Sequence, residues 1–178
     1  ATDQLESMLE RAARGEDISA DFQAFKQYQI AGEEIDLSAE FSILQRIFDG
    51  VSLLGDYNDK IKDHTLAQGE VLSAKFISYL LRKRGVKATF ADSRRFYVTD
   101  SHFGNAQLVE DSSAKSTIQY FTQIPKDVTP IVTGFIAANA SGETTTLGRN
   151  GSNYSASILA SILEAEELQN YTHVDGIF

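Results

Sequence analysis

VTPIVTGFIA, residues 128–137, is the stretch that decides the fold class of this 178-residue chain. Its apolar side chains form a near-continuous run, which is typical of a central strand in a parallel sheet that is covered on both faces. A helical pattern precedes the run at about 112–123, and another follows it at about 152–168. Helix and strand therefore alternate, which predicts an α/β fold with a mostly parallel sheet flanked by helices.

Upstream of this stretch, the sequence divides into two parts. From about 70 to 84 apolar residues recur at helical spacing, Gly85 ends that pattern, and residues 86–91 are typical of a short strand. We expect one structural domain, with a helical segment at 1–67 and an α/β core at 68–178. The helical segment is clearest where apolar residues stand three and four apart, at Leu37, Phe41, Leu44, Ile47, Phe48, Val51 and Leu54.

The composition excludes several classes of function. The chain carries 25 acidic and 16 basic residues, a net charge of -9, so it lacks the positive field that gathers nucleic acid or anionic lipid. It has no cysteine, which excludes disulfides and a cysteine nucleophile. Residues 1–14 do not resemble a secretory leader, and no apolar run approaches membrane-spanning length. We therefore expect a cytoplasmic protein with neither nucleic acid nor membrane as a partner.

A second stretch, TTTLGRNGSNY at residues 144–154, carries the chemistry of the chain. It runs directly into a predicted helix, whose free amides attract anions, and its glycines Gly148 and Gly151 let a ligand approach the backbone. Arg149 adds a planar fork that binds carboxylate or phosphate. The alternative is that the glycines only shape a turn, Ser152 caps the helix and Arg149 is solvated. The spacing alone does not separate these two interpretations.

Glu70 presents a similar choice, because a carboxylate in the first turn of the predicted helix either complements the helix dipole or binds an ammonium group. The three histidines, His64, His102 and His173, have no metal-ligand spacing, so no metal site is predicted. Ser152 lacks the sequence context of a hydrolase nucleophile.

Several short blocks, taken together, resemble the aspartate kinase signature in order and spacing. The blocks cover about residues 66–178: Gly69-Glu70 with Leu72-Ser73, Phe103-Gly104 with Ala106, Gly134-Phe135-Ile136, Thr144 to Arg149, Gly151-Ser152, Tyr154-Ser155-Ala156, and Val174-Asp175-Gly176-Ile177. The preceding helical segment and the loop sequence Arg-Asn-Gly-Ser are more similar to the bifunctional aspartokinase/homoserine dehydrogenase type than to the stand-alone lysine-sensitive enzymes.

This resemblance implies the amino-acid kinase fold, which is carbamate kinase-like. It also implies transfer of the γ-phosphate of ATP, supplied as MgATP, to the β-carboxylate of L-aspartate, the first step towards lysine, threonine and methionine. The implied partners are L-aspartate and ATP as co-substrates, with no tightly bound cofactor. A homo-oligomer is also expected, because open strand edges favour pairing between copies.

The resemblance also implies roles for individual residues. Arg149 grips the α-carboxylate of aspartate and Glu70 pairs with its ammonium group, while Gly148, Gly151 and Ser152 line the substrate and phosphate region. A glutamate or uridylate kinase is disfavoured, because Glu70 and Arg149 together suit an α-amino acid held in the aspartate kinase pattern.

One position in the predicted substrate region departs from the family pattern, and three further positions would fall at the nucleotide-binding edge. Asn153 stands where the family usually has the aspartate of Gly-Ser-Asp-Tyr, and an amide cannot replace that negative charge. Thr172, His173 and Phe178 would fall at the nucleotide-binding edge, where His173 and Phe178 replace the usual aspartate and tyrosine.

The Lys-Phe-Gly-Gly-Thr stretch of the family, whose lysine meets the ATP phosphates, occurs nowhere in the chain. We therefore expect an incomplete kinase fold, truncated at both ends and inactive by itself. The alternative is a non-catalytic binding or oligomerisation module derived from the same fold.

Overall fold

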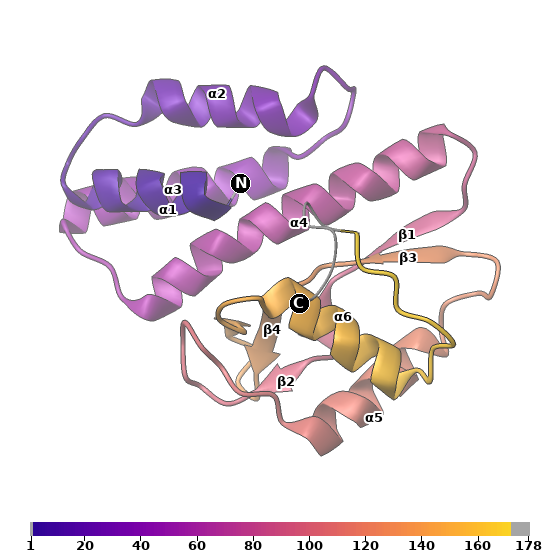
Figure 1. The fold of residues 1–178 in the computed structure, drawn as a ribbon. Helices are drawn as coiled ribbons and strands as arrows, with labels where there is room; N and C mark the ends of the chain where they lie inside the picture. Colours follow the sequence, from indigo (N-terminus) through magenta and orange to yellow (C-terminus); the bar gives the residue numbers. More distant parts are fainter. Residues whose placement is uncertain (1, 172–178) are drawn as a thin grey trace.

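The computed structural model describes residues 2–171, which form a helical layer and an α/β layer on either side of one long helix (Figure 1). The long helix is α4 (Asp59–Lys83), and the helical layer consists of α1 (Thr2–Ala13), α2 (Ser19–Ile30) and α3 (Ser38–Leu54). The α/β layer contains β1 (Ala88–Ala91), the 3-10 turn η1 (Ser93–Arg95), β2 (Val98–Thr99), α5 (Glu110–Phe121), β3 (Thr129–Val132), β4 (Ile136–Asn139), β5 (Thr144–Thr146) and α6 (Gly151–Ile162).

The helical layer is held to α4 by one apolar core. Apolar residues at three- and four-residue spacing bury one face of each helix, as predicted for the segment around α3. The buried members are Leu5, Met8, Leu9, Ala12, Phe22, Phe25, Leu37, Leu44, Phe48, Val51, Leu66 and Leu72. Since Leu66 and Leu72 belong to α4, the layer that carries no predicted chemistry supports the helix that carries Glu70.

The strands form two small sheets, and two of the three strand pairings are parallel. β1 pairs with β3 in parallel, with Ala88 opposite Thr129. β2 pairs with β4 in parallel, and β4 pairs with β5 antiparallel. α4 packs against β1, β3 and β5, and α5 and α6 cover the other side of the β2–β4–β5 sheet through Phe96, Tyr97 and Leu147. The predicted α/β fold with a mostly parallel sheet flanked by helices is confirmed.

The prediction of one strand across residues 128–137 is wrong in its continuity, because this run forms two strands in two different sheets. The chain turns between β3 and β4 at Gly134 and Phe135, where Phe135 has a φ of 67°. The N–H of Ile136 donates to the carbonyl of Gly134 across this turn, at 2.7 Å. An apolar pattern does not reveal a left-handed residue, which for phenylalanine is rare and strained.

α4 begins at Asp59 and not near residue 70, so the predicted helix start is wrong. Asn58 caps it, since its side chain accepts from the N–H of Ile61 at 3.0 Å. Glu70 therefore lies in the middle of α4, where its carboxylate cannot complement the dipole of a first turn. The helix also runs through the expected boundary between residues 67 and 68, since Gly69 is buried in its interior.

The final helix is shorter than its apolar pattern predicts. α6 ends at Ile162 instead of continuing to Leu168, and Glu164 beyond it has a φ of 50°. Ile158 and Leu159 pack on the α/β core, whereas Tyr154 is exposed. Among the helices within residues 2–171, none has the length and apolar character required to cross a membrane.

Candidate functional site

A cavity of about 820 Å³ lies where α4 meets the start of α6. It brings together the residues that the sequence singled out for substrate binding, because Glu70, Gly148, Arg149, Gly151 and Ser152 all line it. Asn153 lines the same cavity. The other lining residues come from the start of α1, from α4 and from the segments around residues 103 and 146: Thr2, Asp3, Glu6, Asp59, Lys62, Asp63, Leu66, Phe103, Gly104, Phe135, Thr146 and Asn150.

Glu70 supplies a half-buried carboxylate to this cavity. Burial raises the pKa of Glu70 above its ordinary value, and hydrogen bonding from the Gly134 backbone partly opposes that rise. Within residues 2–171, Glu70 forms no ion pair with a lysine, arginine or histidine. A carboxylate in this position is suited to bind a cation that enters the cavity, such as an ammonium group.

The loop before α6 is shaped by two residues with left-handed backbone. Gly148 has a φ of 71°, a left-handed conformation that favours glycine, and a Cβ there would meet Oδ1 of Asn105 at 2.3 Å. Asn150 also has a left-handed φ, of 59°, which is a conformation that asparagine tolerates. The turn places Arg149 on the rim of the cavity, where its side chain is exposed.

The start of α6 offers free backbone donors to the same cavity. The N–H groups of Gly151 and Tyr154 donate to the carbonyls of Gly148 and Asn150. Those of Ser152 and Asn153 precede the first N–H that can donate within the helix and, within residues 2–171, have no other hydrogen-bond partner. Two free amides beside a guanidinium form an anion-binding arrangement. Ser152 lies inside the helix and Asn150 holds the cap position, so the alternative in which Ser152 caps α6 is wrong.

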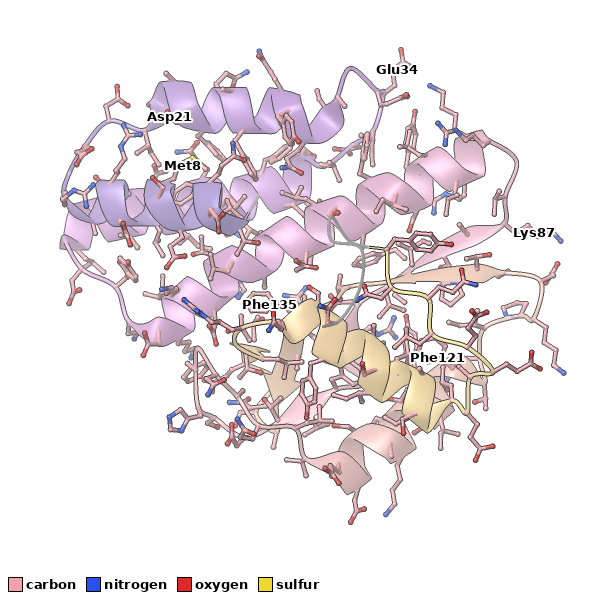
Figure 2. All side chains as sticks on the ribbon, in the orientation of Figure 1. Met8, Asp21, Glu34, Lys87, Phe121 and Phe135 are labelled. Atoms are coloured by element: carbon pink, nitrogen blue, oxygen red, sulfur yellow. The ribbon has the colours of Figure 1, made fainter. Side chains whose placement is uncertain are left out.

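The turn at Phe135 fixes α6 against α4. A Cβ on Gly151 would meet Cδ2 of Phe135 at 2.7 Å, and a Cβ on Gly134 would meet Cβ of Ser152 at 3.0 Å, so both glycines permit close contact. In Figure 2, Phe135 lies between α4 and the start of α6. It packs against Ala67, Val71 and Ile136, and this contact holds the anion-binding end of α6 beside the helix that carries Glu70.

Asp63 is the site residue that sequence reasoning missed. It is 1% exposed, and its carboxylate accepts three hydrogen bonds, from the N–H of Gly104 (2.8 Å), the N–H of Thr146 (3.0 Å) and the hydroxyl of Thr146 (2.8 Å). Burial raises its pKa, and these hydrogen bonds oppose the rise. Asp63 stands seven residues before Glu70 on one face of α4. A helix prediction that began at Asp59 would have placed the two carboxylates on the same face.

Thr172, His173 and Phe178, predicted for the nucleotide edge, lie outside the described residues. His64 lines a separate cavity of about 390 Å³ with Lys60 and Glu143. In the part of the chain described here, no three histidine, aspartate or glutamate side chains are grouped in a way that would hold a metal ion.

Comparison with known proteins identifies the class to which this fold and cavity belong. Residues 5–178 match the model of the amino acid kinase family, and the chain is a member of that family.

Relatives of the chain within the family include aspartokinases. The chain is 32% identical over 156 residues to the chloroplastic bifunctional aspartokinase/homoserine dehydrogenase 1 of Zea mays, a match that spans 84% of this chain and 17% of that protein. It is 30% identical over 142 residues to the lysine-sensitive aspartokinase 3 of Escherichia coli K12, across 76% of this chain and 31% of that protein. The chain thus spans a minor part of the length of these relatives.

The fold is also that of a solved aspartokinase. The crystal structure of E. coli aspartokinase III in complex with aspartate and ADP matches 90% of this chain and 38% of its own chain, with a TM-score of 0.80 and 24% sequence identity. The expected amino-acid kinase fold is therefore confirmed.

Proposed function

We propose that this chain forms the amino-acid half of an aspartate kinase active site and binds L-aspartate in the cavity between α4 and α6. The observation that carries the proposal is that Glu70 and Arg149, 79 residues apart in the sequence (149 − 70), line one cavity with the free amides of α6. An α-amino acid presents an ammonium group and a carboxylate together, and Glu70 and Arg149 offer a charged group suited to each.

In this proposal, Glu70 pairs with the ammonium group of L-aspartate. Arg149 binds the α-carboxylate through two parallel hydrogen bonds, each worth about 1.5–3 kcal/mol when shielded from water. Gly148, Gly151 and Ser152 line the cavity at the start of α6, where the free amides and the helix dipole would stabilise the negative charge of the β-carboxylate. The β-carboxylate is the group that would attack the γ-phosphate of MgATP.

The contribution of these residues to phosphoryl transfer is positioning. Little covalent chemistry falls to the protein in such a reaction, so holding the carboxylate in line with the phosphate and balancing developing charge supply most of the rate. Asn153 is a neutral amide on the cavity wall and does not supply the charge of an aspartate at this place. The lysine-bearing stretch of the family is also not found in the sequence, so we expect the chain alone to bind L-aspartate without transferring phosphate.

Calorimetric titration of the chain with L-aspartate tests the proposal. We expect saturable 1:1 binding of L-aspartate, weaker binding of D-aspartate, and a loss of at least tenfold in affinity for Arg149→Ala and for Glu70→Gln, because each removes one charged contact. Arg46→Ala is the matched control, since Arg46 is an exposed arginine on α3 that does not line the cavity. A folded chain that binds neither enantiomer would refute the proposal and favour the non-catalytic module.

A further inference from the structure

A buried carboxylate on α4, that of Asp63, is hydrogen-bonded to the segment that carries Arg149. The carboxylate of Asp63 on α4 accepts hydrogen bonds from both the N–H and the hydroxyl of Thr146, 83 residues later in the chain. Thr146 is the last residue of β5 and stands three positions before Arg149. The position of the guanidinium relative to α4 therefore depends on where Asp63 holds the end of β5.

The same carboxylate also holds the segment that packs under Gly148. Asp63 accepts from the N–H of Gly104 at 2.8 Å, and the N–H of Ala106 donates to the carbonyl of Thr146 at 2.8 Å. Between them, Asn105 occupies the space where a side chain on Gly148 would stand. Three segments thus meet at Asp63. One of them, residues 104–106, packs against Gly148 in the loop that carries Arg149.

Glu70 belongs to the same rigid element as Asp63. Seven residues on an α-helix correspond to almost two full turns and a rise of about 10 Å, so both carboxylates lie on one face of α4. Glu70 lines the cavity, whereas the oxygens of Asp63 accept hydrogen bonds from Gly104 and Thr146. A group that is 1% exposed and holds three donors is positioned to orient other residues and not to receive a ligand.

We propose that Asp63 is a positioning residue of the L-aspartate site, because it sets the distance between the Arg149 loop and the Glu70 carboxylate. This inference rests on the proposed function, since it assigns the two charged residues to one ligand. A binding site must hold its groups within about 0.5 Å of the productive geometry, so we expect the three hydrogen bonds of Asp63 to affect affinity through the placement of the Arg149 loop.

The test compares two identical substitutions on neighbouring residues of β5. Thr146→Val removes the hydroxyl that donates to Asp63, whereas Thr145→Val removes an equally buried hydroxyl that pairs with Thr99 at 2.7 Å. We expect Thr146→Val to weaken L-aspartate binding about 10-fold and Thr145→Val to change it less than about 2-fold. Thr146→Ser keeps the hydroxyl and is expected to restore affinity to within about 2-fold of the original chain.

The preference for L- over D-aspartate separates positioning from general loosening of the fold. We expect Thr146→Val to lower the ratio of the two affinities at least threefold, because the enantiomers differ in how they span Glu70 and Arg149, while urea unfolding shows that the variant stays folded. Asp63→Asn serves as a second variant, because its amide keeps the shape of the carboxylate and loses the charge; it should reduce the ratio in the same direction.

Two results would overturn the inference. If the original chain binds L-aspartate and Thr146→Val behaves like Thr145→Val in both affinity and enantiomer ratio, Asp63 is only a structural residue and the proposed function stands. If the original chain is folded and binds no L-aspartate, the proposed function fails and this inference fails with it.

Discussion

The N–H of Phe135 donates a hydrogen bond of 2.9 Å to Oγ of Ser155, 20 residues later in the chain. The same hydroxyl donates to the carbonyl of Gly151 at 2.7 Å. Ser155 therefore joins the strained turn between β3 and β4 to the first turn of α6. Because Phe135 is held with a positive φ of 67°, the surrounding contacts must stabilise a conformation that phenylalanine alone disfavours.

Ser155→Ala is expected to lower the free energy of unfolding by about 1–3 kcal/mol, since it leaves the partly buried N–H of Phe135 without its acceptor. Ser157→Ala is the matched control on the same helix, because the hydroxyl of Ser157 also bonds to the carbonyl four residues earlier but is exposed. The control should change stability by less than about 0.5 kcal/mol. Urea unfolding followed by circular dichroism measures both, and equal effects would contradict the assigned role of Ser155.

A larger residue at Gly151 should separate α6 from the turn at Phe135. The added methyl of Gly151→Ala would lie 2.7 Å from Cδ2 and 3.2 Å from Cα of Phe135, so the helix start must shift. We expect a loss of stability of about 1–3 kcal/mol and weaker L-aspartate binding, because the free amides move with the helix.

Gly50→Ala provides the opposite case within the same chain. Gly50 lies inside α3, and a Cβ built on it meets nothing within 4 Å. The substitution should stabilise the chain by about 0.5–1 kcal/mol through the reduced entropy of the unfolded state. If thermal unfolding showed both variants to be stabilised, the close contact at Gly151 would be wrong.

The sequence predicted the features of the fold that depend on local patterns. The alternation of helix and strand is a local pattern, so it predicted the α/β class and the helix around α3. The grouping of Glu70 with Arg149 came from the resemblance to aspartate kinases, because no local pattern relates residues so far apart. Local spacing also left the interpretation of each residue open.

The missed features depend on contacts between distant segments. The apolar run at 128–137 has the composition of one strand, and only the packing of Phe135 against α4 and α6 divides it. Asp63 resembles any charged residue on a helix until Thr146 and Gly104 are placed against it. The start of α4 was misplaced because the apolar pattern was followed only from about residue 70, whereas the helix begins at Asp59 and buries Gly69 in its interior.

Glu70 should make the stability of the chain depend on pH. Burial raises its pKa above the ordinary value of 4.5, so the folded state binds the proton more tightly than the unfolded state. The stability contributed by Glu70 is therefore fully present below about pH 4.5 and is lost as the pH rises through the folded-state pKa. Glu70→Gln should exceed the original chain in stability at pH 7, with the difference vanishing towards pH 4, although it binds L-aspartate poorly.

Glu143→Gln should show the opposite sign. Hydrogen bonds from Lys60 and Asn139 lower the pKa of Glu143, so its contribution is present above the ordinary pKa and is lost as the pH falls through the lowered one. Urea unfolding of the three chains between pH 4 and 8 measures both trends. A Glu70→Gln variant that is less stable than the original at pH 7 would show that the carboxylate is not destabilised by burial.

Asn153→Asp tests whether the amide at the start of α6 determines how the cavity handles charge. Asn153 lies in the first turn of α6 and lines the cavity, so a carboxylate there should raise stability by about 0.3–1 kcal/mol through the helix dipole. The same charge should weaken the binding of L-aspartate severalfold at low ionic strength, because the ligand brings two carboxylates to this end of the cavity. Added salt should reduce that difference, since the Debye length falls to roughly 3 Å at 1 M.

Ser161→Asp is the control for the dipole part of that argument. Ser161 is exposed in the last turn of α6, where negative charge opposes the helix dipole, so this variant should lose about 0.3–1 kcal/mol and keep its affinity for L-aspartate. Stability that moves in the same direction in both variants would rule out the dipole as the cause. Equal affinity in Asn153→Asp and the original chain would mean that the β-carboxylate does not approach this end of α6, and the placement of the ligand would have to be reversed.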